Sequence, residues 1–127
     1  MANRHQEDAA QETVIEWASY HSKLRWLHSI PNGAHLAGKT KIDRAKKMQR
    51  LKKQGLKPGV SDLFLPLVMP PYPGMYIEMK RRKVEGPSKV SPDQKRFQED
   101  MIEQGYKCVI CYGAEEAIKA ITEYAKI

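Results

Sequence analysis

The chain has few cysteines and no long apolar run, and each of these features excludes a class of protein. Two cysteines among 127 residues are too few for a disulfide framework, so we expect a reducing compartment and an intracellular, cytoplasmic protein. No run of about 18 apolar residues is present, so neither a transmembrane helix nor a membrane partner is expected. The charged residues 1–8 are not followed by an apolar stretch, so no secretory signal is expected either. The length predicts a single domain over residues 1–127.

Acidic residues are scarce in residues 39–57, and this segment accounts for the whole excess of positive charge. The chain carries 22 Lys and Arg against 15 Asp and Glu, a net charge of +7. Outside residues 39–57 there are thirteen basic and fourteen acidic residues, a net charge of −1. This concentration indicates a polyanionic partner, with a solvated helix face as the alternative. The basic residues of the segment are Lys39, Lys41, Arg44, Lys46, Lys47, Arg50, Lys52, Lys53 and Lys57.

Apolar spacing and turn signals predict an α/β domain. Three-to-four spacing predicts helices over residues 6–28 and 41–54, and two more that begin after Ser91 and Gly113. Ser91-Pro92-Asp93-Gln94 is a capping-box pattern. Apolar runs predict strands over residues 60–68, 75–80 and 106–112, the first two of them adjacent. An Ile30-Pro31-Asn32-Gly33 turn would end the first helix.

Three polar residues lie where strands would bury them. If the strands at 60–68 and 75–80 pair, Asp62 can stand beside Glu78, and Lys80 projects from the same face as Glu78. Two converging carboxylates need a positive partner, and a divalent cation suits oxygen ligands. Lys80 could then orient a water molecule and offset developing charge. The alternative is an exposed strand face with a Glu–Lys pair and an Asp that starts a strand.

The order and spacing of several motifs resemble the PD-(D/E)XK nuclease core, and more closely the VRR-NUC (virus-type replication-repair nuclease) family. The resemblance covers nearly the whole chain and implies a restriction-endonuclease-like core with a mixed central β-sheet flanked by helices. The matching features are the first helix with Glu7, Gln11 and Trp17, the turn at 30–33, Gly55 to Leu63, Met75 to Lys80, Ser91 to Gln94, and Gly105 to Val109.

The resemblance implies a role for each residue of the central motif. Asp62 and Glu78 would bind Mg²⁺ or Mn²⁺, with the backbone carbonyl of Met79 as a further ligand. Lys80 would polarise the attacking water. Ser61 departs from the family pattern, which often has proline before the Asp, without disturbing these ligands.

Two further residues would complete the catalytic set. Gln94 would support the site, and its role as the capping-box residue is an alternative compatible with this one. Glu7 matches the family's first-helix acid, which completes the metal shell directly or through water. The alternative for Glu7 is a solvated acid in the first turn of a helix.

The function implied is that of a metal-dependent endodeoxyribonuclease. Stand-alone, phage-type members of the family are similar in size, which implies a homodimer acting on branched DNA such as four-way (Holliday) junctions, in the host cytoplasm if phage-encoded. The basic segment and Arg81 and Arg82 are candidate DNA-backbone contacts, with a solvated loop as the alternative for the arginines. A non-catalytic nucleic-acid-binding protein and an RNA-directed nuclease of the same core remain alternatives.

Cysteine and histidine give weaker signals. Cys108 and Cys111 are expected to be buried structural thiols, because positions i and i+3 of a strand face opposite ways and no second pair is present for zinc. His28 and His35 receive no catalytic role.

Overall fold

The computed structural model describes residues 2–31 and 39–127, so the predicted turn at Asn32-Gly33 and His35 lie outside the described residues. Its centre is a four-stranded sheet with the order β1-β2-β3-β4. The first two pairings are antiparallel and the third is parallel, which makes the sheet mixed, as the resemblance implied. The strands are β1 (His28–Ser29), β2 (Leu63–Leu65), β3 (Met75–Lys80) and β4 (Lys107–Tyr112).

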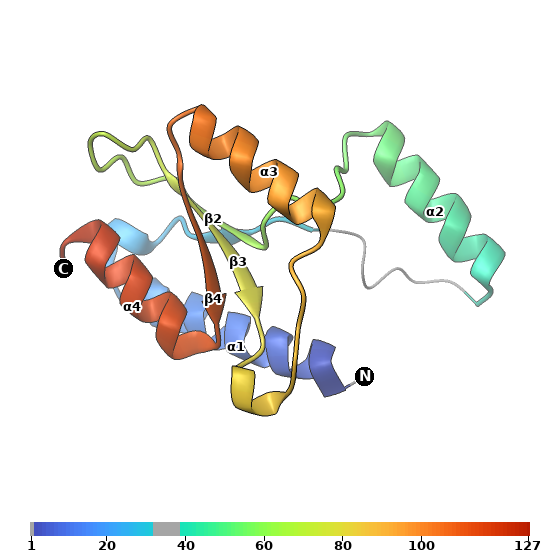
Figure 1. Cartoon of the computed structure of the whole chain (residues 1–127), viewed down its shortest axis with the longest axis horizontal. Helices are drawn as coiled ribbons and strands as arrows, with labels where there is room; N and C mark the ends of the chain where they lie inside the picture. Colours follow the sequence, from blue (N-terminus) through green and yellow to red (C-terminus); the bar gives the residue numbers. More distant parts are fainter. Residues whose placement is uncertain (1, 32–38) are drawn as a thin grey trace.

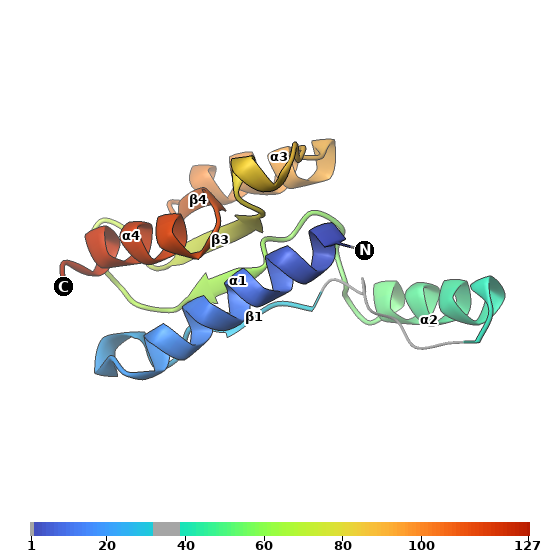
Figure 2. The same cartoon turned by 90° about the horizontal axis from the view of Figure 1, so that it is seen from below.

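Helices cover both faces of this sheet. Helices α1 and α4 pack against each other on one face, and α3 packs on the other, against β4 (Figure 1). Helix α2 stands apart from the sheet, at the end of the molecule where α1 begins (Figures 1 and 2). The helices are α1 (Ala2–Ser19), α2 (Lys41–Lys53), α3 (Pro92–Glu103) and α4 (Ala114–Ala125), with two 3-10 turns at Ser22–Leu24 and Lys83–Glu85.

The predicted single α/β domain is therefore confirmed. In the part of the chain that the structure describes, no helix has both the length and the apolar character needed to cross a bilayer.

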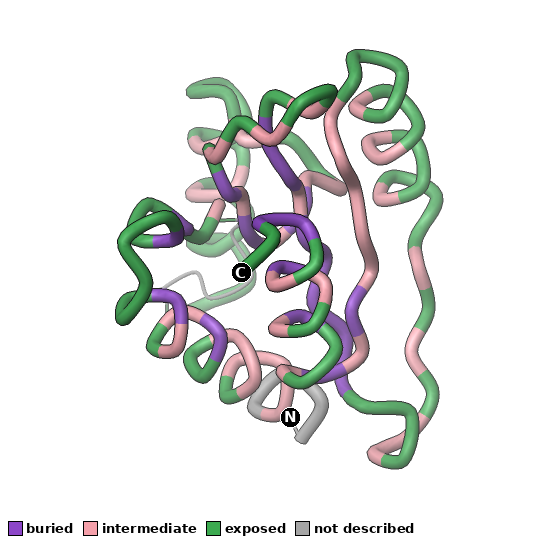
Figure 3. Tube along the Cα trace, turned by 90° about the vertical axis from the view of Figure 1, so that its left-hand side faces the viewer, coloured by how far each residue is buried: buried purple, intermediate pink, exposed green. Residues whose placement is uncertain are grey.

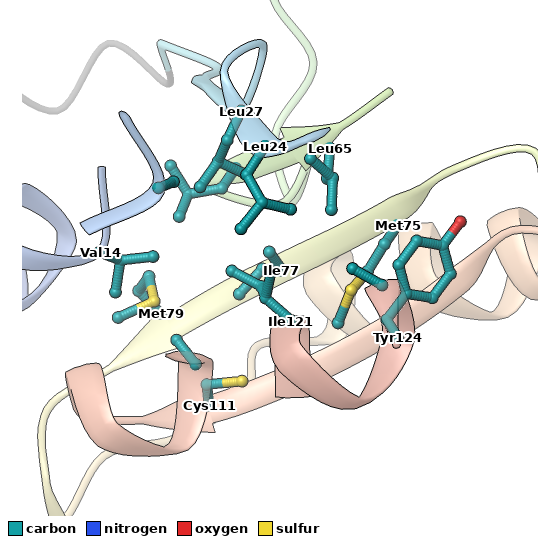
Figure 4. Close-up of a cluster of buried hydrophobic side chains, with 14 residues drawn as sticks. Val14, Leu24, Leu27, Leu65, Met75, Ile77, Met79, Cys111, Ile121 and Tyr124 are labelled. Carbon is teal, nitrogen blue, oxygen red and sulfur yellow. The ribbon is translucent and has the colours of Figure 1, made fainter. Parts of the chain in front are cut away.

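The main core lies between β3 and the pair α1 and α4. Side chains alternate along β3, so Ile77 and Met79 point to the same face and meet Val14 of α1 and Ile121 of α4 (Figure 4). Buried residues concentrate along the central strands and on the inner sides of α1 and α4 (Figure 3). The other face of β3 carries Glu78, which is nevertheless buried. Strand β3 is thus buried on both faces, although half of its positions are polar or aromatic.

The first helix is shorter than the apolar spacing predicts. It ends at Ser19 rather than near residue 28, because His21 adopts an extended backbone with φ −114° and ψ 124°. A helix over residues 6–28 would be about 34 Å long, whereas a six-residue strand spans about 20 Å. Turning back after Ser19 instead brings Leu24 and Leu27 into the core and leads into β1. The sequence did not indicate β1, which has two exposed residues.

The strand predicted over residues 60–68 is also shorter, since β2 contains three residues. Pro66 follows directly and has no N–H to donate to a neighbouring strand. The remaining elements follow the predictions within one or two residues, including α3 with its capping box between Ser91 and Gln94.

Candidate active site

Strands β2 and β3 bring two acidic side chains face to face. Leu63 pairs with Ile77 in an antiparallel register, which places Asp62 opposite Glu78. Asp62 Oδ2 accepts a hydrogen bond of 2.7 Å from the backbone N–H of Met79, and this contact fixes the carboxylate beside β3. The predicted approach of the two carboxylates is confirmed by this geometry.

The Glu78 carboxylate is buried, and only one of its two oxygens accepts a hydrogen bond from an N–H group. Its side chain is 3% exposed, and Oε2 accepts a hydrogen bond of 3.1 Å from Gln94 Nε2. No N–H or O–H group donates to the buried Oε1, but the carboxyl of Asp62 is close enough to share a proton with Glu78. Burial, and then the neighbouring charge of Asp62, raise the pKa of Glu78 well above its usual range, while Lys80 acts in the opposite direction. A buried acceptor without a donor is costly, and a cation at this place would satisfy it.

Lys80 and Gln94 extend the site toward α3. Lys80 Nζ donates a hydrogen bond of 3.0 Å to Gln94 Oε1, and the same oxygen accepts one of 2.9 Å from the backbone N–H of Ser91. Ser91 Oγ in turn accepts from the backbone N–H of Gln94 at 3.1 Å, which closes the capping box. The two interpretations of Gln94 are therefore compatible, because one side chain caps the helix and contacts both Lys80 and Glu78.

Helix α1 contributes Glu7 from its second turn. Burial raises the pKa of this half-buried carboxyl, and Asp62 adds to the rise. Lys80 and a hydrogen bond from the backbone of Arg81 oppose it. Glu7 is therefore close enough to Asp62 for the two charges to interact. This interaction argues against the alternative in which Glu7 is a fully solvated acid.

The candidate metal ligands do not include a third close side chain. Within residues 2–31 and 39–127, no three side chains of His, Cys, Asp or Glu gather closely enough to hold an ion by themselves. Asp62 and Glu78 are therefore the candidate side-chain ligands, and Glu7 is not close enough to form a group of three with them.

Gly59 positions the loop that precedes Asp62. It has a φ of +88°, and a Cβ atom there would overlap the backbone of Asp93 at the start of α3. This close approach joins the loop that carries Asp62 to the helix that carries Gln94. The sequence gives no signal for this role of Gly59, since the approach depends on two segments far apart in the sequence.

The basic segment, residues 39–57, contains the exposed helix α2, which lies on the side of the molecule where α1 and α3 begin (Figures 1 and 2). Thr40 Oγ1 caps α2 by accepting from the N–H of Asp43 at 3.1 Å, and none of the residues of α2 is buried. Ile42 is 68% exposed, and no apolar side chain of α2 belongs to the core. Helix α2 lies on the side where α1 and α3 begin, which are the ends that carry Glu7 and Gln94 (Figures 1 and 2).

The two arginines after β3 have local partners. Arg81 is buried, and its Nε donates to the carbonyl of Gly86 at 3.3 Å. Arg82 is exposed and pairs with Glu85 at 3.1 Å. Contact with DNA therefore stays a prediction for both, and the geometry favours Arg82 over Arg81.

Both cysteines are free thiols; Cys111 is buried, as predicted, whereas Cys108 is only partly buried. Burial raises the pKa of Cys108 to about 11 and that of Cys111, which also lies near Glu116, to about 12. Without a metal, both thiols are therefore protonated at neutral pH and poor nucleophiles.

Comparisons with known proteins agree with this geometry. The model of the VRR-NUC domain family matches residues 5–115, a range that includes every residue of the candidate site. A solved structure named VRR_NUC domain protein is 25% identical, with a TM-score of 0.77, over 95% of this chain and 88% of that one. No curated protein matches the chain.

Proposed function

Because this chain belongs to the VRR-NUC domain family, nucleases of the PD-(D/E)XK type, we propose that it hydrolyses phosphodiester bonds in DNA with a divalent metal ion. The observation that carries the proposal is the buried pair of carboxyl groups of Glu78 and Asp62, in which no N–H or O–H group donates to Oε1 of Glu78. Such a pair is unfavourable with both groups ionised unless a shared proton or a bound cation compensates for their charge.

The donor set fits a hard cation. Asp62 and Glu78 would hold Mg²⁺ or Mn²⁺ with the backbone carbonyl of Met79, and Glu7 would contact its water shell. When bound, the ion would supply Lewis-acid activation of water and neutralise charge on the phosphate.

The residues of the chain would position the reactants. Gln94 holds the ammonium group of Lys80, so Lys80 can orient the attacking water and stabilise the negative charge that develops on the phosphate. Water forms a bond to phosphorus while the bond to the 3′ oxygen breaks, which leaves a 5′-phosphate on one product and a 3′-hydroxyl on the other.

Recognition would depend on the DNA backbone rather than on base sequence. Helix α2 lies on the side where α1 and α3 begin (Figures 1 and 2), and most of its basic side chains are exposed, so they could neutralise phosphates of bound DNA. We propose branched DNA such as a four-way junction as substrate and a homodimer as the active form, because a two-fold assembly presents two sites to two symmetric strands. A light-scattering mass of one chain at micromolar concentration would contradict the dimer.

Cleavage assays test the nuclease. A labelled four-way junction, a matched linear duplex and a matched RNA are incubated with Mg²⁺, Mn²⁺ or EDTA. We expect metal-dependent cutting of the DNA, reduced about 100-fold or more by Lys80→Ala. Lys119→Ala, which removes the same charge from an exposed position of α4, is the matched control and retains activity.

Other outcomes would support the alternatives. Salt-sensitive binding with no cutting in either metal would favour a non-catalytic binding protein, and preferential cutting of the RNA would favour an RNA-directed nuclease.

A further inference from the structure

The sheet face that carries Asp62 and Glu78 also carries a row of aromatic rings, for which the proposed chemistry has no use. His28 pairs with Phe64 across β1 and β2, and Phe64 pairs with Tyr76 across β2 and β3. The ring centroids are 5.9 Å apart for His28 and Phe64, and 4.5 Å for Phe64 and Tyr76. We call these three side chains the aromatic row.

The aromatic row lies directly beside the carboxylate pair. Side chains two residues apart in a strand share a face, so Phe64 lies on the face of Asp62, and Tyr76 on the face of Glu78. Two residues span about 6.5 Å along a strand. A phosphate placed at the carboxylates would therefore bring its neighbouring nucleotide over the row.

The aromatic row is open at its β1 end. At the other end, Phe97 of α3 packs edge-on against Tyr76 with centroids 5.0 Å apart. Tyr106 also packs edge-on against Tyr76 and Phe64, with centroids 5.4 and 6.0 Å apart, so the row is open to a ligand only on the side of His28 and Phe64. His28, by contrast, is exposed, and Phe64 is partly exposed. Gly74 lies against the Phe64 ring, where a Cβ atom would overlap it, and this contact supports the ring from β3.

The ring of His28 is fixed in place. Its Nδ1 lies 2.9 Å from the carbonyl of Trp26, and a carbonyl can only accept, so Nδ1 carries the hydrogen. The ring is thus held at the edge of the row before any ligand binds.

We propose that the aromatic row is a subsite for an unpaired nucleobase next to the scissile phosphate. This inference rests on the proposed function, which brings DNA to Asp62 and Glu78. Aromatic faces stack on any base, whereas a base inside an intact duplex is already stacked between its neighbours. The substrate class is therefore DNA with an unpaired nucleotide at the cut, as at a fork, a flap or an opened branch point.

Binding assays in Ca²⁺, an oxygen-preferring cation used in place of the proposed Mg²⁺ or Mn²⁺, test the row. The probes are a forked duplex with 2-aminopurine as its first unpaired nucleotide and a fully paired duplex with the same label, both at one Ca²⁺ and one salt concentration. We expect the wild type to prefer the fork and to quench the 2-aminopurine. Phe64→Leu reduces affinity for the fork roughly fivefold or more, as expected for the loss of base stacking. Its affinity for the duplex is unchanged.

Substitutions at His28 separate stacking from charge and avoid any effect on folding, because this side chain is exposed. His28→Phe retains the fork preference and the quenching, whereas His28→Lys loses both. Phe97→Leu, the matched control on the covered side of Tyr76, retains both. Equal affinity of the wild type for fork and duplex, or a fork preference that His28→Lys preserves and His28→Phe abolishes, would overturn the inference.

Cleavage of the same two probes with Mg²⁺ or Mn²⁺ reports separately on the nuclease. Cutting without any fork preference in binding would leave the proposed function intact and reject the subsite. Fork-selective quenching without cutting would reject the nuclease and support base binding by the row.

Discussion

Gln94 and Glu78 are joined by a hydrogen bond of 3.1 Å from the amide Nε2 to the carboxylate Oε2, which couples the first turn of α3 to the buried centre of β3. The other amide atom, Oε1, accepts from Lys80 Nζ and from the backbone of Ser91. Gln94, the third residue of α3, therefore closes the capping box and also sets the positions of the carboxylate and the ammonium group.

Gln94→Ala should reduce both stability and activity. The loss of the capping box costs about 1 kcal/mol of unfolding free energy. Release of Lys80 should lower kcat by about 10-fold to 100-fold with a smaller effect on KM. Ser91→Ala is the control, because it removes the cap but leaves the contacts of Gln94 with Lys80 and Glu78 in place. Urea denaturation and steady-state cleavage measure the two effects, and equal losses of kcat in both variants would argue against a positioning role.

Glu78→Gln should make the metal-free protein more stable at neutral pH while abolishing cleavage. Burial and Asp62 raise the pKa of Glu78 from 4.5 to about 9. The folded state therefore favours the protonated carboxyl, so its contribution to stability is greatest below the unfolded pKa and declines as pH rises from about 4.5 toward 9. Urea denaturation in EDTA at pH 5 and pH 8 measures this decline.

The difference between wild type and Glu78→Gln isolates the contribution of this group. We expect the difference in unfolding free energy between the two proteins to change by at least about 1.4 kcal/mol between pH 5 and pH 8, the equivalent of one pKa unit. Added Mg²⁺ or Mn²⁺ should reduce the decline in the wild type alone. A difference that does not vary with pH would show that the carboxylate is not destabilised by burial.

Gly59→Ala should reduce stability and cleavage together. The side chain would meet the backbone of Asp93, and the φ of +88° disfavours any residue with a Cβ atom. Gly105→Ala is the matched control, because its φ is +99° but no atom lies within 4 Å of the added Cβ. We expect Gly105→Ala to cost about 1 kcal/mol. Gly59→Ala should lower the unfolding free energy clearly more and should also displace Asp62, which reduces cleavage. Similar thermal unfolding and similar activity of the two variants would contradict this expectation.

Charge removal on α2 should weaken DNA binding without altering the fold. Lys46 and Lys52 are exposed, so the double substitution to Ala should leave thermal stability nearly unchanged. If each contacts a phosphate, the slope of log K against log salt falls by about 1.8. Affinity should fall to a similar extent for junction and duplex, because phosphate contacts carry no sequence or branch information. An unchanged salt slope in a titration would show that α2 does not bind the backbone.

The sequence by itself determined the local features of this protein. Ser91 and Gln94 specify the start of α3, because a capping box involves atoms three residues apart. The alternation from Met75 to Lys80 specifies a strand and places Glu78 and Lys80 on one face. The basic excess of residues 39–57 also needs no structure to be recognised.

The tertiary structure decided what depends on segments distant in sequence. Helix α1 ends at Ser19 because Leu24 and Leu27 gain burial by turning back, which helical spacing does not reveal. The buried carboxyl pair of Asp62 and Glu78 and the row that includes Phe64 exist only once the strands are in register. Local hydrogen bonds and periodicity act over three or four residues, whereas burial, strand register and electrostatic coupling depend on which distant residues become neighbours.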